Sequence, residues 1–177
     1  MPPKLLLQAL SGIYEQIEQL GVSPVIAGGL AVSYWGNPRS TQDIDLAVVV
    51  SDLRRFESEL HRLGLRPAKS NRWVDLGFVR VSQWTLNIEE QYIDCKIDFL
   101  NSDSRFHRQA ISHAVECRFV GLDRELKVLT CEDLLLYKAA SGRIIDLADI
   151  RMLRELHEED LDFDYMRRWA QELGISL

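Results

Sequence analysis

Two short motifs near the amino terminus contain residue types that could act on a phosphate. The glycine pair Gly28-Gly29 is followed, after thirteen further residues, by the triplet Asp43-Ile44-Asp45. A glycine pair that opens a helix lets backbone N–H groups approach a phosphate closely. Two carboxylates at positions i and i+2 of a strand point to the same side, where they can share a divalent cation. In this order the motifs suggest transfer chemistry on a nucleoside triphosphate.

The segment between these motifs, from Asn37 to Gln42, is mostly polar. It offers a guanidinium, two hydroxyl groups and two amides, all of which can bind anionic oxygens. Arg39 is equally suited to reach a phosphate and to pair with Asp43, so both interpretations stay open. Each motif alone also has another explanation. Glycine pairs form ordinary tight turns, and sugar-nucleotide glycosyltransferases hold a metal diphosphate with a similar Asp-x-Asp motif.

A further acidic side chain comes from the segment 92–99, where apolar and polar residues alternate. The polar positions, which share one face of the predicted strand, are Asp94, Lys96 and Asp98. An antiparallel strand with one solvated face gives the same alternation. Beside Asp43 and Asp45, however, a third carboxylate on a neighbouring strand would suit a centre with two cations about 4 Å apart, where one carboxylate helps to deprotonate an attacking hydroxyl.

The rest of the pattern predicts helices and strands around this site. Apolar residues at helical spacing predict helices at residues 4–20, 30–35, 52–63, 104–113, 130–140, 146–156 and 162–173. Short apolar or alternating runs predict strands at residues 24–27, 44–50, 78–81, 84–88, 92–100, 115–120 and 126–129. Ser51 is placed to cap the helix that follows it. This order indicates one α+β, or mixed α/β, domain over residues 1–177, with a core at about 22–129 and C-terminal helices at about 130–177.

The composition is that of an ordinary globular protein, with 46% hydrophobic and 27% charged residues. No apolar run approaches the roughly 18 residues that span a bilayer, and the run Leu5–Leu7 is too short for the core of a secretory signal. We therefore expect a cytoplasmic protein that does not contact membranes. The net charge of −6 argues against nonspecific affinity for nucleic acid. The basic stretch 54–72 could still touch a phosphate backbone, or simply form the solvated face of a helix.

The other reactive side chains show no spacing typical of metal ligands. Cys95, Cys117 and Cys131 form no Cys-x-x-Cys motif, so neither a disulfide framework nor a zinc site is predicted. We interpret Cys95 and Cys117 as buried small hydrophobes. The histidines are interpreted as surface or helix residues and the tryptophans as core or rim aromatics: His61, His107, His113, His157, Trp35, Trp73, Trp84 and Trp169.

Together these motifs resemble the DNA polymerase β-like nucleotidyltransferase superfamily. The segments that carry the resemblance are Gly28-Gly29, the spacer with Arg39 and Thr41, Asp43-Ile44-Asp45, and Lys96-Ile-Asp98-Phe-Leu. Two later segments resemble the abortive-infection, type IV toxin–antitoxin group of these enzymes: Leu129-Thr-Cys-Glu-Asp-Leu-Leu-Leu-Tyr-Lys138 and Gly142-Arg-Ile-Ile-Asp146-Leu-Ala-Asp149-Ile150. The likeness spans roughly residues 22–153.

The resemblance implies a small mixed β-sheet flanked by helices, and Mg²⁺-dependent transfer of a nucleoside monophosphate from an NTP to a hydroxyl. Two Mg²⁺ ions, with Mn²⁺ as a substitute, would be held by Asp43, Asp45 and Asp98. Asp98 would also act as the general base or orient it. It is favoured over Asp94 because its apolar neighbours match the family's third-carboxylate pattern.

The resemblance also implies which residues would bind the triphosphate: Gly28, Gly29, Arg39, Thr41 and Lys138, with Asp146 or Asp149 near the lysine. A structural explanation exists for part of this set. A lysine on an apolar helix often extends to solvent, and Arg143 with Asp146 at i+3 can form a plain surface pair.

We therefore expect a nucleotidyltransferase whose partners are an NTP and an unknown acceptor, either RNA such as tRNA, a protein or a small molecule. If the enzyme is a toxin, an antitoxin protein is a further partner. The main alternative is a noncatalytic relative that binds a nucleotide or a partner protein, although the presence of all three expected carboxylates argues against it. A metal-dependent glycosyltransferase would need a longer nucleotide-sugar domain than this chain provides.

Overall fold

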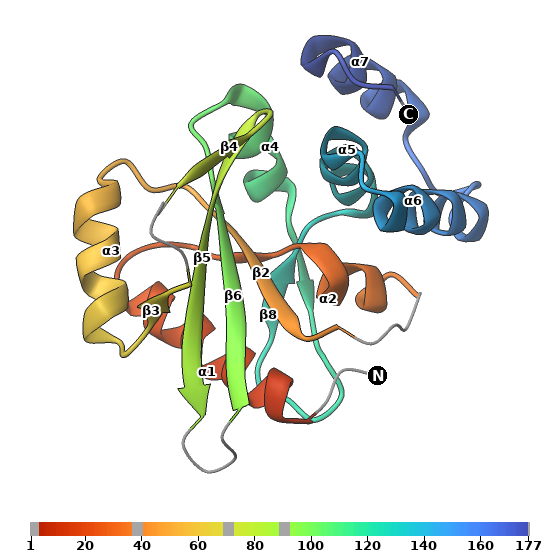
Figure 1. Cartoon of the computed structure of the whole chain (residues 1–177). Helices are drawn as coiled ribbons and strands as arrows, with labels where there is room; N and C mark the ends of the chain where they lie inside the picture. The colour runs from red at the N-terminus through yellow and green to blue at the C-terminus, as the bar shows by residue number, and fades with distance from the viewer. Residues whose placement is uncertain (1–3, 37–40, 69–72, 89–92, 177) are drawn as a thin grey trace.

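The computed structural model describes residues 4–36, 41–68, 73–88 and 93–176, and these residues form one mixed sheet with helices around it (Figure 1). The helices are α1 (Lys4–Gln19), α2 (Gly28–Tyr34), α3 (Leu53–Arg62), α4 (Arg105–His113), α5 (Cys131–Ser141), α6 (Ile144–Leu156) and α7 (Phe163–Leu173). The strands are β1 (Val25–Ile26), β2 (Asp43–Val48), β3 (Arg66–Pro67), β4 (Val74–Leu76), β5 (Val79–Ile88), β6 (Ile93–Asn101), β7 (Val115–Cys117) and β8 (Leu126–Val128). The predicted α+β class is confirmed.

The strands follow the order β3-β5-β6-β2-β1-β8-β7, and β4 pairs with β5 outside this path. The long strands β5 and β6 form an antiparallel hairpin, whereas β2 pairs with β6 in parallel. Strand β1 pairs antiparallel with β2 and parallel with β8. This order makes β2 and β6 direct neighbours, although some forty-five residues separate them along the chain. The two acidic motifs of the sequence therefore lie on adjacent strands.

One face of the central strands belongs to the core. Ile44 and Leu46 of β2 and Ile97 of β6 are fully buried, because alternate residues of a strand point to opposite faces. Helix α1 passes behind β5 and β6 in Figure 1 and contributes its apolar side to the same core. Helix α3 covers the neighbouring part of this face, where Phe56 packs edge-on against Phe99 at 5.2 Å between ring centroids. The opposite face of the same strands carries their polar residues.

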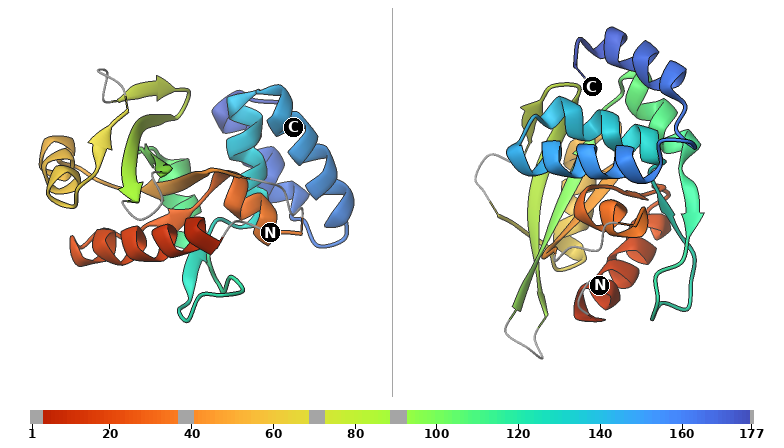
Figure 2. Two further views of the ribbon diagram at one scale, coloured as in Figure 1. Left: turned by 60° about the horizontal axis from the view of Figure 1, so that its bottom comes forward. Right: turned by 90° about the vertical axis from the view of Figure 1, so that its right-hand side faces the viewer.

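Helices α5, α6 and α7 lie together at one side of the sheet (Figure 2). The N-cap hydroxyl of Thr130 accepts a hydrogen bond from the Asp133 N–H and so begins α5. Gly142 adopts a left-handed conformation, φ +63°, which ends α5 immediately before α6. The prediction that Ser51 caps α3 is wrong. Its neighbour Asp52 is the cap, and its carboxylate accepts a hydrogen bond of 3.0 Å from the Arg55 N–H.

His107 lies on helix α4, in agreement with the interpretation of the histidines as surface or helix residues, and its side chain is fully buried. Its Nε2 lies 2.7 Å from the Val48 carbonyl, and its Nδ1 contacts the Tyr137 hydroxyl. Because a carbonyl can only accept, Nε2 donates and Nδ1 accepts, which makes the ring neutral. Burial lowers the pKa of His107 accordingly. The bond ties β2 to α4, and the tyrosine extends this link to α5.

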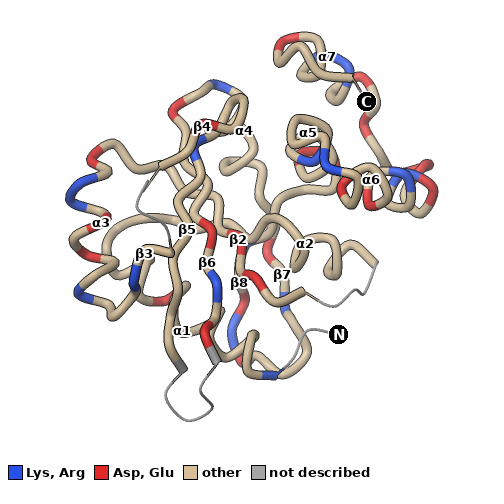
Figure 3. The backbone as a smooth tube through the Cα atoms, viewed as in Figure 1, with Lys and Arg blue, Asp and Glu red and all other residues tan. Residues whose placement is uncertain are grey.

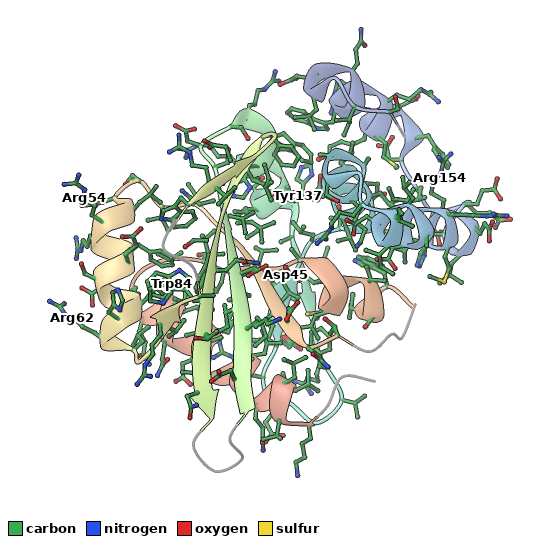
Figure 4. All side chains as sticks on the ribbon, in the orientation of Figure 1. Asp45, Arg54, Arg62, Trp84, Tyr137 and Arg154 are labelled. Carbon is green, nitrogen blue, oxygen red and sulfur yellow. The ribbon has the colours of Figure 1, made fainter. Side chains whose placement is uncertain are left out.

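The three cysteines are buried and unpaired, as predicted for Cys95 and Cys117. Burial raises the pKa of Cys95 to about 11 and that of Cys117 and Cys131 to about 12. Within the described ranges, no helix combines the length and the apolar character needed to cross a membrane. In Figure 4 the labelled arginines of the basic stretch, Arg54 and Arg62, extend from α3 into solvent, as expected of a solvated helix face.

Candidate active site

Asp45 of β2 and Asp98 of β6 are direct partners in the parallel ladder. Paired residues of adjacent strands point to the same face, so both carboxylates leave the sheet on the side opposite the core. Asp43 lies two residues before Asp45 and shares that face, with Lys96 as its own ladder partner. The acidic positions of β2 and of the upper part of β6 lie near the middle of the molecule (Figure 3). The structure thus brings together the three carboxylates that the sequence singled out.

The three carboxylates lie close enough to influence one another's charge. The pKa of Asp45 is raised to about 6, first by its removal from solvent and then by the negative charges of Asp98 and Asp43. A hydrogen bond from the Gly29 backbone N–H opposes this rise. Asp43 Oδ1 is buried and has no hydrogen-bond partner among the residues that the structure describes. The group therefore concentrates negative charge that a bound cation would relieve.

The glycine pair lies directly against this carboxylate group. Gly28 has φ +55°, and a Cβ atom at this position would lie 1.9 Å from Asp45 Oδ2. Only a residue without a side chain fits there, because the contact is far shorter than any van der Waals distance. Helix α2 begins at the glycine pair itself, two residues earlier than predicted. Backbone and carboxylate thus meet without an intervening side chain.

A cleft of about 370 Å³ opens above Gly28, Asp45 and Asp98. Its polar end also includes Gln83 from β5 and, on the helical side, Lys138, Ser141, Arg143 and Asp146. Its other end is lined mainly by apolar side chains from the β4–β5 hairpin, from β6 and from α5: Leu76, Phe78, Val81, Leu100, Leu134 and Tyr137. The labelled Asp45 and Tyr137 in Figure 4 mark the two regions. The site is therefore a cleft between the polar face of the sheet and α5, open to a ligand of small-molecule size.

Lys138 is held inside an ion-pair network rather than extended into solvent. Its side chain is 4% exposed, and its Nζ donates to Asp146 Oδ1 at 2.7 Å and to Asp149 Oδ2 at 2.8 Å. Asp146 also accepts hydrogen bonds from the Ser141 hydroxyl and from Arg143 Nε, the latter at 2.6 Å. The interpretation of Lys138 as a solvent-exposed lysine is wrong, and Asp146 is fully buried rather than part of a plain surface pair.

Burial favours the neutral form of Asp146, but the hydrogen bonds from Arg143, Lys138 and Ser141 outweigh it and lower the pKa to about 2. The carboxylate is consequently ionised at neutral pH. This network joins the end of α5 to the start of α6 and fixes one wall of the cleft.

Two described residues of the predicted triphosphate site, Gly29 and Thr41, do not line the cleft. Arg39 falls outside the described residues. Thr41 precedes β2, and its Oγ1 lies 3.4 Å from the Asp43 carbonyl, a long contact. Asp94, the other candidate for the third carboxylate, lies at the start of β6, four residues before Asp98, and pairs with Asn87. The register therefore places Asp98, and not Asp94, beside Asp45.

Gln83 is a site residue that sequence reasoning missed. It is the ladder partner of Asp98 on β5, and its Nε2 donates to Asp98 Oδ2 at 3.1 Å. An amide on the polar face of a strand carries no signal of its own, because its role depends on which residue lies opposite. Only the β5–β6 register, which places Gln83 opposite Asp98, identifies this residue.

The donor set suits a hard divalent cation, since carboxylate oxygens are the ligands that Mg²⁺ prefers. The buried Asp43 Oδ1 that has no described partner, and the charge repulsion at Asp45, both favour a cation at this point. In the described part of the chain, no three side chains of Asp, Glu, His or Cys already converge as a finished ligand set. The residues fit a magnesium ion by the chemistry of their oxygens, although their side chains do not form a complete ligand set in the described part of the chain.

Comparison with known proteins places the fold. No protein-family model and no curated protein matches this chain, whereas several solved structures do. An antigenic nucleotidyltransferase-like protein from Paracoccidioides brasiliensis is 17% identical with a TM-score of 0.52, over 94% of this chain and 88% of the other. The lincosamide antibiotic adenylyltransferase LnuA, solved with lincomycin, is 16% identical with a TM-score of 0.53, over 84% of this chain and 96% of its own.

A third similar structure is ANT(2″)-Ia in complex with adenylyl-2″-tobramycin. It is 16% identical, with a TM-score of 0.54, over 94% of this chain and 95% of that chain. At such identities the likeness establishes the architecture. The chain has the nucleotidyltransferase fold, as the sequence motifs implied.

Proposed function

We propose that this protein is a Mg²⁺-dependent nucleotidyltransferase. It would move a nucleoside monophosphate from an NTP to an acceptor hydroxyl: the acceptor oxygen forms a bond to the α-phosphorus, the bond to the β-phosphate oxygen breaks, and pyrophosphate leaves. The observation that carries the proposal is the pairing of Asp45 with Asp98, next to Asp43, at the floor of a cleft that Gly28 lines. The shared fold of the similar structures supports it.

In this proposal Asp43, Asp45 and Asp98 hold the divalent cations. The bound cations supply positive charge that offsets the charge developing on the phosphate oxygens. Asp98 accepts the proton of the acceptor hydroxyl or orients the group that does, and Gln83 fixes the carboxylate through its 3.1 Å hydrogen bond. A protonated acceptor is a poor nucleophile, so this step prepares the attack.

The triphosphate lies along the glycine side of the cleft. At Gly28 the backbone comes close to the carboxylates without a side chain between them, which leaves room for phosphate oxygens. Gly29, Thr41 and Arg39 complete this side in the proposal. Lys138 adds positive charge from within its aspartate network.

Radioactive label transfer tests the proposal. The protein is incubated with each α-labelled NTP, Mg²⁺ or Mn²⁺, and separately with RNA, a protein extract, lincomycin or tobramycin as acceptor. The last two are chosen because LnuA and ANT(2″)-Ia were solved with lincomycin and an adenylylated tobramycin. We expect label on one acceptor class and its loss in Asp45→Asn. Label that persists in that variant, or NTP binding without transfer to any acceptor, would contradict the proposal and favour a nucleotide-binding relative.

The proposal extends to a toxin that an antitoxin protein neutralises, on the sequence likeness of residues 129–150 to the toxin–antitoxin group. Expression in a bacterial host should then arrest growth, and Asp98→Asn should restore it at equal protein level. Normal growth with an active enzyme would limit the function to acceptor modification.

A further inference from the structure

Arg143 stands at the junction between α5 and α6, where it faces the carboxylate group across the cleft. It follows the left-handed Gly142 and is the N-cap residue of α6. Its side chain lines the same cleft as Gly28, Asp45 and Asp98 and is 70% exposed. The arginine is therefore positively charged and accessible to a ligand that enters the cleft.

The other cation on this side of the cleft, Lys138, already forms ion pairs within the protein. Its ammonium is bonded to Asp146 and Asp149, whose side chains are 0% and 3% exposed. These bonds satisfy two of the three donors of the ammonium inside the protein, and the group itself is 4% exposed. A phosphate that reached Lys138 would have to displace a buried carboxylate, which is costly. Of the two cations that line the cleft, Arg143 is by far the more exposed.

The guanidinium of Arg143 is held in a defined orientation. Its Nε donates to Asp146 Oδ2 at 2.6 Å, while Nη2 is a distant 3.4 Å from Oδ1. Asp146 thus binds the Nε–Nη2 edge of the guanidinium, which leaves the edge that ends in Nη1 outside this pair. Attraction to Asp45 and Asp98 contributes to the raised pKa of Arg143, after the dominant hydrogen bond to Asp146. The arginine therefore acts across the cleft on the place where phosphates would lie.

We propose that Arg143 binds the terminal phosphates of the NTP and distinguishes a triphosphate from a monophosphate. This inference rests on the nucleotidyltransferase proposal, in which the α-phosphate reacts beside Asp45 and Asp98. The wall of the cleft that carries Arg143 then faces the β- and γ-phosphates, which leave as pyrophosphate. A planar guanidinium that is fixed along one edge suits bidentate binding of a phosphate, whereas a lysine provides only a point charge. Asp146 is the positioning residue for this contact.

Calorimetric binding with Mg²⁺ tests this assignment without any acceptor. The ligands are the four NTPs, AMP and inorganic tripolyphosphate, and the variants are Arg143→Gln and Arg143→Lys. The matched control is Arg151→Gln, because Arg151 lies on the same helix and forms a similar local pair with Glu155 at 3.0 Å, but does not line the cleft. Circular dichroism confirms that each variant is folded, which we expect for a side chain as exposed as Arg143.

We expect Arg143→Gln to weaken binding of the preferred NTP and of tripolyphosphate by roughly 10- to 100-fold, the value of a lost charge-assisted contact. Arg143→Lys should recover part of this loss, whereas AMP binding and Arg151→Gln should be unaffected. An equal loss for AMP, an equal loss in Arg151→Gln, or no binding of any triphosphate by the native protein would overturn the inference. If the native protein binds triphosphates strongly and Arg143→Gln loses this binding, but no acceptor is labelled, the inference on Arg143 holds. Only the proposed reaction is then contradicted.

Discussion

Asp45 and Asp98 lie opposite each other on two parallel strands, and Gln83 donates to the second of them from the next strand along. Three adjacent strands therefore contribute one polar group each at the same level of the sheet. The next level along, toward the start of β2, contains Asp43, Lys96 and Thr85. The backbone register decides which residues lie opposite one another. Each site residue can therefore be compared with a residue of the same type that the register places elsewhere.

Asp98→Asn should abolish transfer, whereas Asp94→Asn should not. Both aspartates lie on the polar face of β6, but only Asp98 is beside Asp45. Loss of a carboxylate that holds the cation and receives a proton should lower kcat by about a thousand-fold or more. Initial rates at saturating NTP, measured for both variants, give the comparison. Similar rates for the two variants would show that register does not define the site.

Mg²⁺ should stabilise the native protein and have little effect on Asp45→Asn. A ligand that binds only the folded state raises the unfolding temperature, and this carboxylate would hold the ion. Without divalent cations the variant should unfold at a higher temperature than the native protein, since Asp98 and Asp43 repel the charge of Asp45. Relief of this repulsion and of the desolvation of Asp45 should stabilise the fold by about 1–3 kcal/mol. Thermal unfolding in EDTA and in excess Mg²⁺ measures both effects, and identical Mg²⁺ shifts in the two proteins would contradict the assignment.

Gly28→Ala should destabilise the protein and inactivate it. The added methyl group would overlap Asp45 Oδ2, and the positive φ disfavours any side chain. We expect a loss of about 2–4 kcal/mol in the free energy of unfolding. Gly12→Ala is the control, because Gly12 lies inside α1 and a methyl group added there would meet no atom from outside its own helix within 4 Å. This control should gain about 0.5–1 kcal/mol. Urea unfolding of both variants checks the difference, and a neutral Gly28→Ala would mean that α2 can shift away from the carboxylate.

The Asp146 network should make stability depend on pH in the acid range. Its folded pKa of about 2 lies below the ordinary value of 3.8, so the unfolded chain binds more protons between these values. The stabilisation is then complete above about pH 5 and is lost as pH falls toward 2, a change of about 2 kcal/mol. The gap in unfolding free energy between native protein and Asp146→Asn should narrow over this range. The control is Asp164→Asn, which breaks an exposed pair with Arg167. Its difference in unfolding free energy from the native protein should be small and nearly the same at each pH. A difference for Asp146→Asn that does not change with pH would refute the role of the network.

Gln83→Leu should lower kcat by about 10-fold with little change in the KM for NTP, because it removes the amide that orients Asp98. Asn87→Leu, which removes the equivalent bond to Asp94 at the far end of the hairpin, should leave kcat unchanged. Steady-state kinetics over a range of Mg²⁺ concentrations checks both variants. If Gln83→Leu raised only the KM, the amide would contact the nucleotide rather than the carboxylate.

The sequence supports local features of this molecule better than their assembly. The alternation that predicts β6 and the helical spacing that predicts α1 follow from periodicity, and both elements form as expected. Which face of β6 carries the site is also implied, because a strand buried on one side has one polar side left for a site. The choice between Asp94 and Asp98 required the family pattern, and the β2–β6 register supports Asp98 as the residue beside Asp45.

What periodicity cannot supply is the environment of a polar residue within the fold. Lys138 occurs on the apolar helix α5 and His107 on the amphipathic helix α4, and a charged or polar side chain on either kind of helix ordinarily extends to solvent. Each is instead buried by partners from elsewhere in the chain, Asp149 for the lysine and the Val48 carbonyl for the histidine. The start of α3 is a second case that the sequence pattern does not decide. Ser51 and Asp52 can both cap a helix, and a shift of one residue in the helix start determines which of them does so.

The sequestration of every cysteine in the chain has a practical consequence. Thiol reagents attack the thiolate, and Cys95, Cys117 and Cys131 are both inaccessible and hard to ionise near neutrality. A cysteine introduced on the exposed side of α6, for example by Arg151→Cys, would react with a maleimide dye far faster than the native thiols. Single-site fluorescence labelling is thus available without first removing any of them.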